Sequence, residues 1–324
     1  MTCYQASVAR LTICAALVLC QSGYSAPAQA LPVQKPHAAA PTKTLKFPTK
    51  APLAQLYCYY PASSLHPDHP VETRILAQGN VTIPTDIHIS LKLLYAGLEQ
   101  LALLKQINAN QVTKLDSAGL EFDDSHMEQL KDFTSIWRIN LDSTSITDKT
   151  IPILAKFKGL RDLRLSKVDI TGGNFELLSG LPIHIINLNG SNLKEGNLGR
   201  IKNLPETLDN LNVSRTDIGP RDIALISKCK KLTSLNIGGC NKITDQCMKS
   251  LLGLKMLDDL YVEDTQVTEK SLAIFAQMPN LHKVIVRNKT FWKLGQGKSP
   301  RADLVIEDSV SQSRTPVDVF GPLH

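Results

Sequence analysis

Residues 229–245 of the chain read CKKLTSLNIGGCNKITD. Leu235 and Ile237 alternate with polar residues after Leu232, as in a short strand that places every second side chain on one face. Thr244 and Asp245 predict a helix start, with a hydroxyl N-cap followed by a carboxylate in the first turn. One unit of this size cannot bury its own apolar face, so it predicts a repeat.

The unit recurs along the chain at intervals of 23 to 25 residues. The positions equivalent to Leu235, named anchors below, are Leu115, Ile139, Leu163, Ile186, Leu211, Leu235, Leu260 and Val284. Two residues after each anchor stands an apolar residue, except for Ser117 in the first unit. A third apolar position follows seven or eight residues after every anchor but the last. Such a period with the pattern L-x-x-L-x-L indicates a stacked solenoid.

Residues 229–245 resemble the cysteine-containing subclass of the leucine-rich repeat family, and units such as TSITD at 144–148 resemble its bacterial relatives. The resemblance covers roughly residues 91 to 291. It implies an α/β leucine-rich repeat solenoid (horseshoe) with a parallel concave sheet, convex helices and about eight repeats of 23–25 residues. It also implies that Cys229 and Cys240 are buried thiols.

The first 30 residues have the features of a secretory signal peptide. Arg10 precedes the apolar stretch 11–20, and an A-x-A pattern ends at Ala30. We therefore expect a secreted or periplasmic protein, cleaved near Ala30 and without a transmembrane segment in the mature chain. In an alternative reading, residues 17–20 resemble a lipobox and Cys20 anchors a lipoprotein.

Composition suggests the remaining organisation. The Pro/Ala/Lys-rich residues 31–70 predict a disordered linker, and residues 71–111 predict an N-terminal cap for the solenoid. The repeat domain is expected over residues 112–294, where Phe291, Trp292 and Leu294 cap the last core layer. Residues 295–324 predict a C-terminal tail that is mostly disordered.

The sequence contains no strong catalytic or metal-binding motif. The net charge of +6 is spread among carboxylates, which argues against nucleic acid as a partner. The pairs Asp123–Asp124 and Asp258–Asp259, and the loop residues His66 and His69, are interpreted as structural or solvated. We therefore expect no enzyme activity, no cofactor and no metal. The disulfide state of Cys58, Cys229, Cys240 and Cys247 stays open, because an exported chain permits pairing.

The concave face is the predicted binding surface, since a solenoid displays there a rigid array of side chains free to specify a partner. The small residues five positions after the anchors, such as Thr144, are expected to bond the turn instead. An alternative is that the amides only solvate the sheet. The candidate binding residues are Arg138, Asn140, Arg164, Asn187, Asn212, Asn236, Tyr261, Glu263, Ile285 and Arg287.

These features predict an exported, non-enzymatic module that binds an unknown protein or peptide on its concave face. A cell-envelope or glycan-binding protein is a second interpretation, because amides and hydroxyls bond sugars. A third is a substrate-recognition subunit of a ubiquitin ligase, a role that the resemblance to cysteine-containing repeats implies and that the signal peptide contradicts.

Overall fold

The structure is a computed structural model that describes residues 41–59, 73–287, 291 and 299–308. The chain divides into two units, Met1–Ala39 and Ala40–His324, and every described residue belongs to the second. The predicted signal peptide, the lipobox at Cys20 and the loop with His66 and His69 lie outside the described residues. Within the described part of the chain, no helix is both long and apolar enough to cross a membrane.

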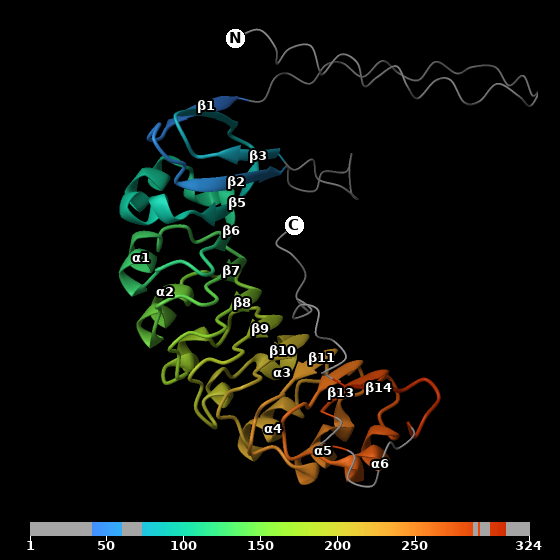
Figure 1. The fold of residues 1–324 in the computed structure, drawn as a ribbon. Helices are drawn as coiled ribbons and strands as arrows, with labels where there is room; N and C mark the ends of the chain where they lie inside the picture. The colour runs from blue at the N-terminus through green and yellow to red at the C-terminus, as the bar shows by residue number, and fades with distance from the viewer. Residues whose placement is uncertain (1–40, 60–72, 288–290, 292–298, 309–324) are drawn as a thin grey trace, which may run out of the picture. The chain divides into compact units, whose positions relative to one another are not determined.

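A twelve-stranded sheet runs through the described unit (Figure 1). Its strand order is β14-β13-β12-β11-β10-β9-β8-β7-β6-β5-β2-β3, so neighbours in sequence are neighbours in space across the repeats. The repeat strands are β6 (Val112–Asp116), β7 (Arg138–Asn140), β8 (Asp162–Arg164), β9 (Ile185–Asn187), β10 (Asn210–Asn212), β11 (Ser234–Asn236), β12 (Asp259–Tyr261) and β13 (Lys283–Val286).

The predicted anchors form one continuous row of this sheet. Each anchor pairs with the next in parallel register, from Leu115 opposite Ile139 to Leu260 opposite Val284. All eight anchors are at most 1% exposed, as burial of one face of a parallel sheet requires. The repeat register predicted from the sequence is therefore confirmed.

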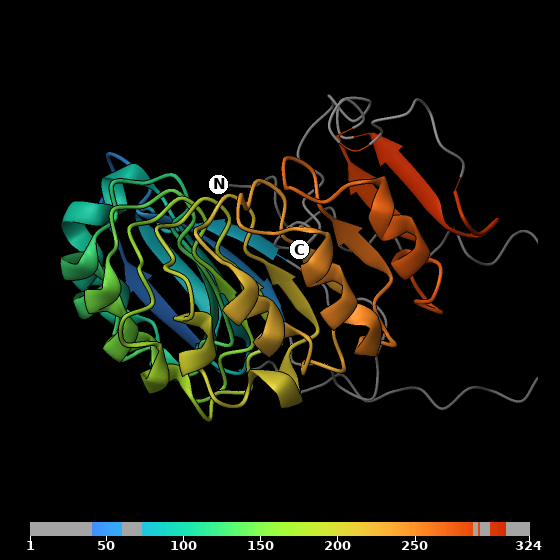
Figure 2. The same ribbon diagram turned by 90° about the horizontal axis from the view of Figure 1, so that it is seen from below.

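Short helices cover the face of the sheet on which the anchors are buried, named the helix side here (Figures 1 and 2). The α-helices are α1 (Asp124–Gln129), α2 (Ile151–Leu154), α3 (Leu204–Thr207), α4 (Pro220–Ile226), α5 (Asp245–Ser250) and α6 (Leu272–Phe275). The 3-10 helices are η1 (Tyr95–Gln106), η2 (Ala109–Gln111), η3 (Asp148–Thr150), η4 (Phe175–Leu178), η5 (Leu198–Arg200), η6 (Leu251–Gly253) and η7 (Glu269–Ser271). Thr147, Thr244 and Thr268 occupy N-cap positions. The hydroxyls of Thr147 and Thr268 accept a backbone N–H, whereas that of Thr244 makes no capping hydrogen bond, so the predicted hydroxyl cap is wrong there.

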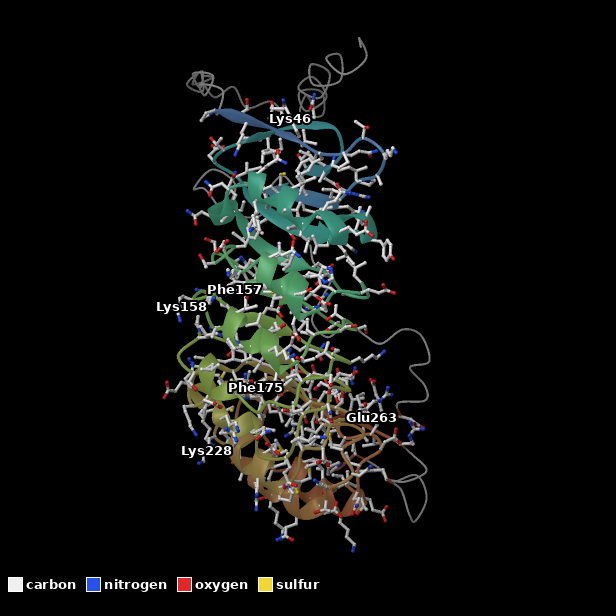
Figure 3. The ribbon with its side chains drawn as sticks, turned by 90° about the vertical axis from the view of Figure 1, so that its left-hand side faces the viewer. Lys46, Phe157, Lys158, Phe175, Lys228 and Glu263 are labelled. Atoms are coloured by element: carbon white, nitrogen blue, oxygen red, sulfur yellow. The ribbon has the colours of Figure 1, made fainter. Side chains whose placement is uncertain are left out.

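The core lies between the strands and the helices. Phe122, Phe157, Phe175 and Phe275 are at most 1% exposed and fill the space between the two layers. Figure 3 shows Phe157 and Phe175 on the helix side of the sheet. Each such ring stabilises the fold by about 3 kcal/mol or more, the usual loss when a buried Phe is cut to Ala.

The turn after each strand has a fixed backbone conformation. The residue four positions after the anchor has a positive φ in the seven described units: 72° at Gly119, 56° at Ser143, 54° at Lys167, 63° at Gly190, 55° at Arg215, 72° at Gly239 and 53° at Asp264. In the first six of these units its N–H donates to a carbonyl of the following unit, as from Ser143 to Ser166 (2.7 Å). Where the next residue is Ser or Thr, it donates its hydroxyl back to a carbonyl of the strand, as from Thr144 Oγ1 to Leu141 (2.7 Å). The other residues that do so are Ser191, Thr216 and Thr265. The predicted structural role is therefore confirmed for these Ser and Thr residues. Val168 has no group to donate, and the Cys240 thiol donates to the Val213 carbonyl of the preceding repeat (3.3 Å).

The N-terminal cap begins earlier than predicted. Strands β1 (Thr42–Lys46) and β2 (Ala54–Tyr59) lie in the stretch expected to be a disordered linker. β1 pairs with β4 (Asn80–Pro84), and β2 pairs with β5 (His88–Leu93) and with the edge strand β3 (Thr73–Leu76). The linker prediction is wrong for these residues, because alternating apolar side chains on β2 join the core.

The C-terminal end is also more ordered than predicted. Strand β14 (Val305–Asp308) lies in the expected tail and extends the sheet in parallel beside β13. The Arg301 guanidinium holds this segment by donating to the carbonyls of Met278 (2.5 Å) and Leu281 (2.6 Å). The prediction of a mostly disordered tail is wrong for residues 299–308. Phe291 is 2% exposed, in accord with its predicted capping role.

Candidate functional site

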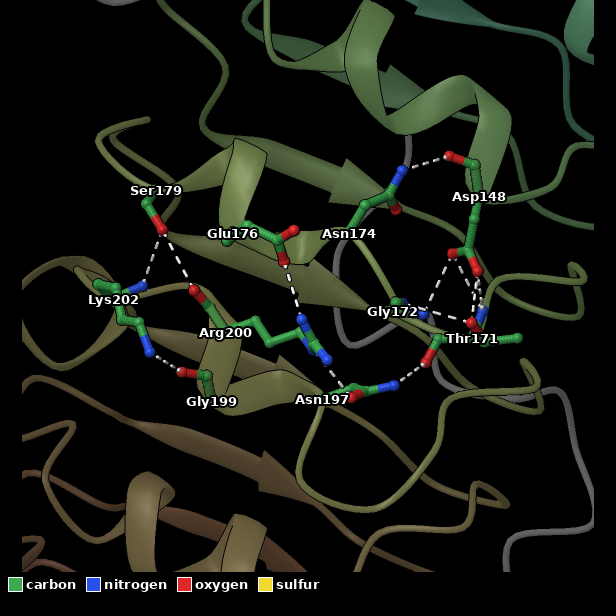
Figure 4. Close-up of polar contacts among 11 residues, drawn as sticks. Asp148, Thr171, Gly172, Asn174, Glu176, Ser179, Asn197, Gly199, Arg200 and Lys202 are labelled. Atoms are coloured by element: carbon green, nitrogen blue, oxygen red, sulfur yellow. Dashed lines mark hydrogen bonds and ion pairs between the residues drawn. The ribbon is translucent and has the colours of Figure 1, made fainter.

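Polar side chains on the helix side hold successive repeats together. Asp124, at the start of α1, accepts hydrogen bonds from the N–H and hydroxyl of Thr147 (2.9 and 2.7 Å). Asp245 binds Thr268 one repeat later in the same way (2.8 and 2.8 Å). Asp148 contacts Thr171 and accepts the Gly172 N–H (3.1 Å), as Figure 4 shows. These carboxylates have the structural role expected for Asp123–Asp124.

The same close-up shows how the middle repeats continue the pattern (Figure 4). Arg200 pairs with Glu176 (3.3 Å), and Ser179 bonds both the Arg200 carbonyl (3.2 Å) and the Lys202 N–H (3.1 Å). Many polar groups on the helix side therefore serve contacts between repeats. A partner that bound there would compete with the packing of the solenoid.

The opposite face of the sheet, named the sheet face here, carries two rows of outward-pointing residues set by the strand register. The first row is Tyr57, Ser90, Lys114, Arg138, Asp162, Ile185, Asn210, Ser234, Asp259, Lys283 and Val305. The second row is Gln55, Lys92, Asp116, Asn140, Arg164, Asn187, Asn212, Asn236, Tyr261, Ile285 and Glu307. Neighbouring residues in a row are about 4.8 Å apart, the spacing of paired strands.

Eight of the ten sequence-predicted binding residues fall in these rows. Glu263 and Arg287 stand just beyond them, two residues after Tyr261 and Ile285. Arg138, Asn212, Asn236, Tyr261, Glu263 and Arg287 are partly exposed. Asn140, Arg164, Asn187 and Ile285 are buried and have little surface for a partner.

The asparagines of the second row stabilise the turns that follow them by hydrogen bonds. Asn140, Asn187, Asn212 and Asn236 accept through Oδ1 the backbone N–H two residues later, at 3.0 to 3.2 Å. Their amides therefore do more than solvate the sheet. Among the described residues, their Nδ2 groups make no hydrogen bond, and those of the partly exposed Asn212 and Asn236 can donate to a partner.

Charged groups form a network near the N-terminal end of the sheet face. Asp162, 1% exposed, pairs with Arg138 (2.5 Å) and with Arg164 (3.3 Å). Two strands closer to the cap, Asp116 lies 3.9 Å from Lys92. Burial raises the pKa of Asp116, although the Ala118 N–H, Lys92 and Arg164 act in the other direction. The network fixes its cations by paired contacts instead of leaving them free to move.

An aromatic–basic patch adjoins this network, formed by Tyr57, Tyr59, Lys114, Trp137 and Arg138. The Lys114 ammonium lies 5.1 Å from the centre of the Tyr59 ring and 5.4 Å from that of Trp137. The Arg138 guanidinium lies 5.7 Å from the Trp137 ring. These distances are within the range of cation–π attraction. Trp, Tyr and Arg are also the residues most enriched in binding hot spots.

Sequence reasoning missed most of this patch, although a signal was present. Residues 55–59, QLYCY, alternate with period two, so Leu56 and Cys58 point into the core and Tyr57 and Tyr59 point out. Reading the stretch as a linker concealed that alternation. Trp137 stands two residues before the anchor Ile139, at an offset that none of the predicted binding residues has.

The C-terminal end of the sheet face is acidic and partly desolvated. Burial raises the pKa of Glu263 and that of Asp259, which the neighbouring Asp258 raises further. Burial and the nearby carboxylates raise the pKa of Tyr261 to about 12. Arg287 pairs with Asp264. The two ends of the face therefore differ in charge.

The four described cysteines do not form a reactive site. Cys58, Cys229, Cys240 and Cys247 are unpaired and buried, in accord with the buried thiols expected at Cys229 and Cys240. Burial raises the pKa of Cys58 and of Cys229 to about 11, so few thiolates exist at neutral pH. Within the described ranges, no three His, Cys, Asp or Glu side chains are grouped to hold a metal ion.

Comparisons with known proteins yield solved structures but no sequence match. No protein-family profile and no curated protein sequence matches the chain. The structure is similar to that of internalin InlF from Listeria monocytogenes, with a TM-score of 0.47 and 18% identity over 58% of this chain and 51% of that chain. Internalin C2 of the same organism gives a TM-score of 0.34 and 24% identity over 58% and 66%. This chain thus spans about half to two thirds of those proteins. On the strength of its own register and core, the chain folds as a leucine-rich repeat solenoid.

Proposed function

We propose that this chain is an exported, non-enzymatic module that binds a protein or peptide on its sheet face. The observation that carries the proposal is the aromatic–basic patch at one end of two unbroken rows of sheet-face residues. Rigid aromatic side chains beside fixed cations favour protein binding, because little side-chain entropy is lost when a partner docks.

The helix side is a poorer candidate. Its carboxylates and hydroxyls make many of the contacts between repeats, as with Asp124 and Thr147. The outward Nδ2 donors of the sheet-face asparagines favour a second candidate, a cell-envelope glycan. A role in a ubiquitin ligase has no supporting observation on the sheet face.

Paired variants test the proposed surface. The mature chain and its Trp137→Ala, Tyr261→Ala and Lys158→Ala variants are used to capture partners from surface proteins and from purified envelope glycan. Lys158 follows α2 on the helix side (Figure 3) and serves as the matched control. For a captured protein we expect Kd to rise about tenfold or more in Trp137→Ala and to stay unchanged in Lys158→Ala. Equal binding by all variants would refute the proposal, and capture of glycan alone would favour the second candidate.

A further inference from the structure

We infer that the aromatic–basic patch binds an acidic segment of the partner, with glutamate or aspartate side chains facing Lys114 and Arg138. This inference rests on the proposed function and adds the chemistry of the partner to it. Three observations carry it: the change of charge along the sheet face, the way the two cations are held, and the hydrogen-bond donors that continue from the patch.

The charge of the two rows changes sign along the sheet. On β2, β5, β6, β7 and β8 the rows hold four cations and two carboxylates, a net of two positive charges. The cations are Lys92, Lys114, Arg138 and Arg164, and the carboxylates are Asp116 and Asp162. The rows on β9, β10 and β11 hold no charged residue. On β12, β13 and β14, Asp259 and Glu307 face one cation, Lys283. An acidic segment is attracted to the first end and repelled by the last.

The patch presents its cations in fixed positions. Lys114 lies within about 5.5 Å of two ring centres. Asp162 engages Arg138 through Nε, which leaves its terminal guanidinium nitrogens to donate to another carboxylate. Side chains held in this way lose less entropy on binding than free surface lysines do.

The donors continue beyond the patch along the second row. The partly exposed Asn212 and Asn236 use Oδ1 for their own turns, so each offers only its N–H groups outward. A surface of donors matches a ligand of acceptors, such as carboxylates and the carbonyls of an extended peptide.

The same geometry disfavours a sugar at the patch. Stacking of a sugar ring needs an open aromatic face, whereas cations lie near the rings of Tyr59 and Trp137. The patch instead presents two positive charges, those of Lys114 and Arg138, close to aromatic rings. We therefore take an acidic peptide as the occupant and treat an anionic glycan as an alternative outcome of the test.

Trp137 provides a direct readout. The chain has two tryptophans, so a Trp292→Phe background leaves Trp137 as its only indole. Its emission is followed while the mature chain is titrated with a glutamate-rich octapeptide, a lysine-rich octapeptide or polygalacturonate. Lys114→Gln and Arg138→Gln remove the charges of the patch, and Lys158→Gln and Lys228→Gln are the matched helix-side controls (Figure 3). Thermal melting followed by circular dichroism verifies that each variant is folded.

We expect saturable binding of the glutamate peptide alone, weakened about tenfold by Lys114→Gln or by Arg138→Gln and unchanged in both controls. Binding should also weaken as NaCl rises from about 0.05 to 0.5 M, because exposed charges are screened. Binding of the lysine peptide, preferential binding of polygalacturonate, or no saturable binding of the glutamate peptide would each overturn the inference. If the glutamate peptide fails while Trp137→Ala still weakens capture of a protein partner, only the acidic chemistry is wrong and the proposed function stands.

Discussion

Replacing Gly119 by alanine isolates the cost of the left-handed turn that follows each strand. Gly119 has φ 72°, and a Cβ added there would meet no atom within 4 Å. The substitution therefore adds backbone strain without a steric clash. Strain of this kind costs about 1–2 kcal/mol for a residue with a Cβ.

Gly159→Ala is the matched control. A Cβ at Gly159 also meets nothing within 4 Å, and its φ is not in the left-handed range. Both variants lose the same flexibility in the unfolded chain, which stabilises each by roughly 0.4–1 kcal/mol. That contribution cancels in the comparison, so Gly119→Ala should be less stable than Gly159→Ala by about 1–2 kcal/mol.

Urea denaturation of residues 31–324, followed by circular dichroism, measures this difference. The m-values should agree, because the two variants expose the same surface on unfolding. In thermal melts the gap should be about 2–8 °C for a domain of this size. Equal stability of Gly119→Ala and Gly159→Ala would refute the claim that the turn requires this conformation.

Three further predictions concern the hydroxyl of Thr144, the partly buried carboxylate of Glu263 and strand β14. Thr144→Val should cost about 1 kcal/mol in urea denaturation, since it removes the hydrogen bond to the Leu141 carbonyl; an unchanged midpoint would contradict the assigned register. Glu263→Gln should raise Tm at pH 7. The pKa of Glu263 in the folded chain lies above its ordinary value of 4.5, so the folded wild type binds a proton more tightly than the unfolded chain does. The wild type therefore gains stability as pH falls from 7 through the folded pKa toward 4.5. The Tm gap should therefore shrink toward pH 4, and a gap independent of pH would rule out this cause. Arg301→Ala should speed hydrogen exchange at the β14 amides, because it removes the two hydrogen bonds to the carbonyls of Met278 and Leu281. Unchanged exchange would show that β14 is held without Arg301.

The repeat register was predictable because it depends on a pattern that one sequence displays fully. Apolar residues at fixed offsets can form a common core only if the strands stack in order, and the sheet pairs Leu211 with Leu235 as that argument requires. The flanks were harder to predict. Strands β2 and β14 lack the repeat spacing and owe their order to the sheet edges that they cover.

The turn conformation could not be predicted from residue type. Lys167 and Arg215 adopt φ 54° and 55°, although residues with a Cβ rarely do so. The hydrogen bonds that their N–H groups donate to the following repeat (2.7 Å each) favour this conformation over local preference. Tertiary contacts of this kind are invisible in a single unit.

The candidate site was only partly predictable for a related reason. Sequence offsets identified which residues face outward, but burial depends on neighbouring strands, and it leaves Asn140 and Arg164 little exposed. The aromatic–basic patch brings Tyr59 of the cap beside Lys114 and Trp137, residues far apart in sequence. The pairing of β2 with β5, of β5 with β6 and of β6 with β7 creates that proximity.

Hydroxyl-radical footprinting of residues 31–324, alone and bound to a captured protein partner, tests the central claim most directly. Binding on the sheet face predicts that Trp137, Tyr57 and Tyr59 lose most of their oxidation on binding. Leu177 on the helix side (46% exposed) and Met256 (52% exposed) should keep theirs. Protection of Leu177 with unchanged oxidation of Trp137 would contradict the account.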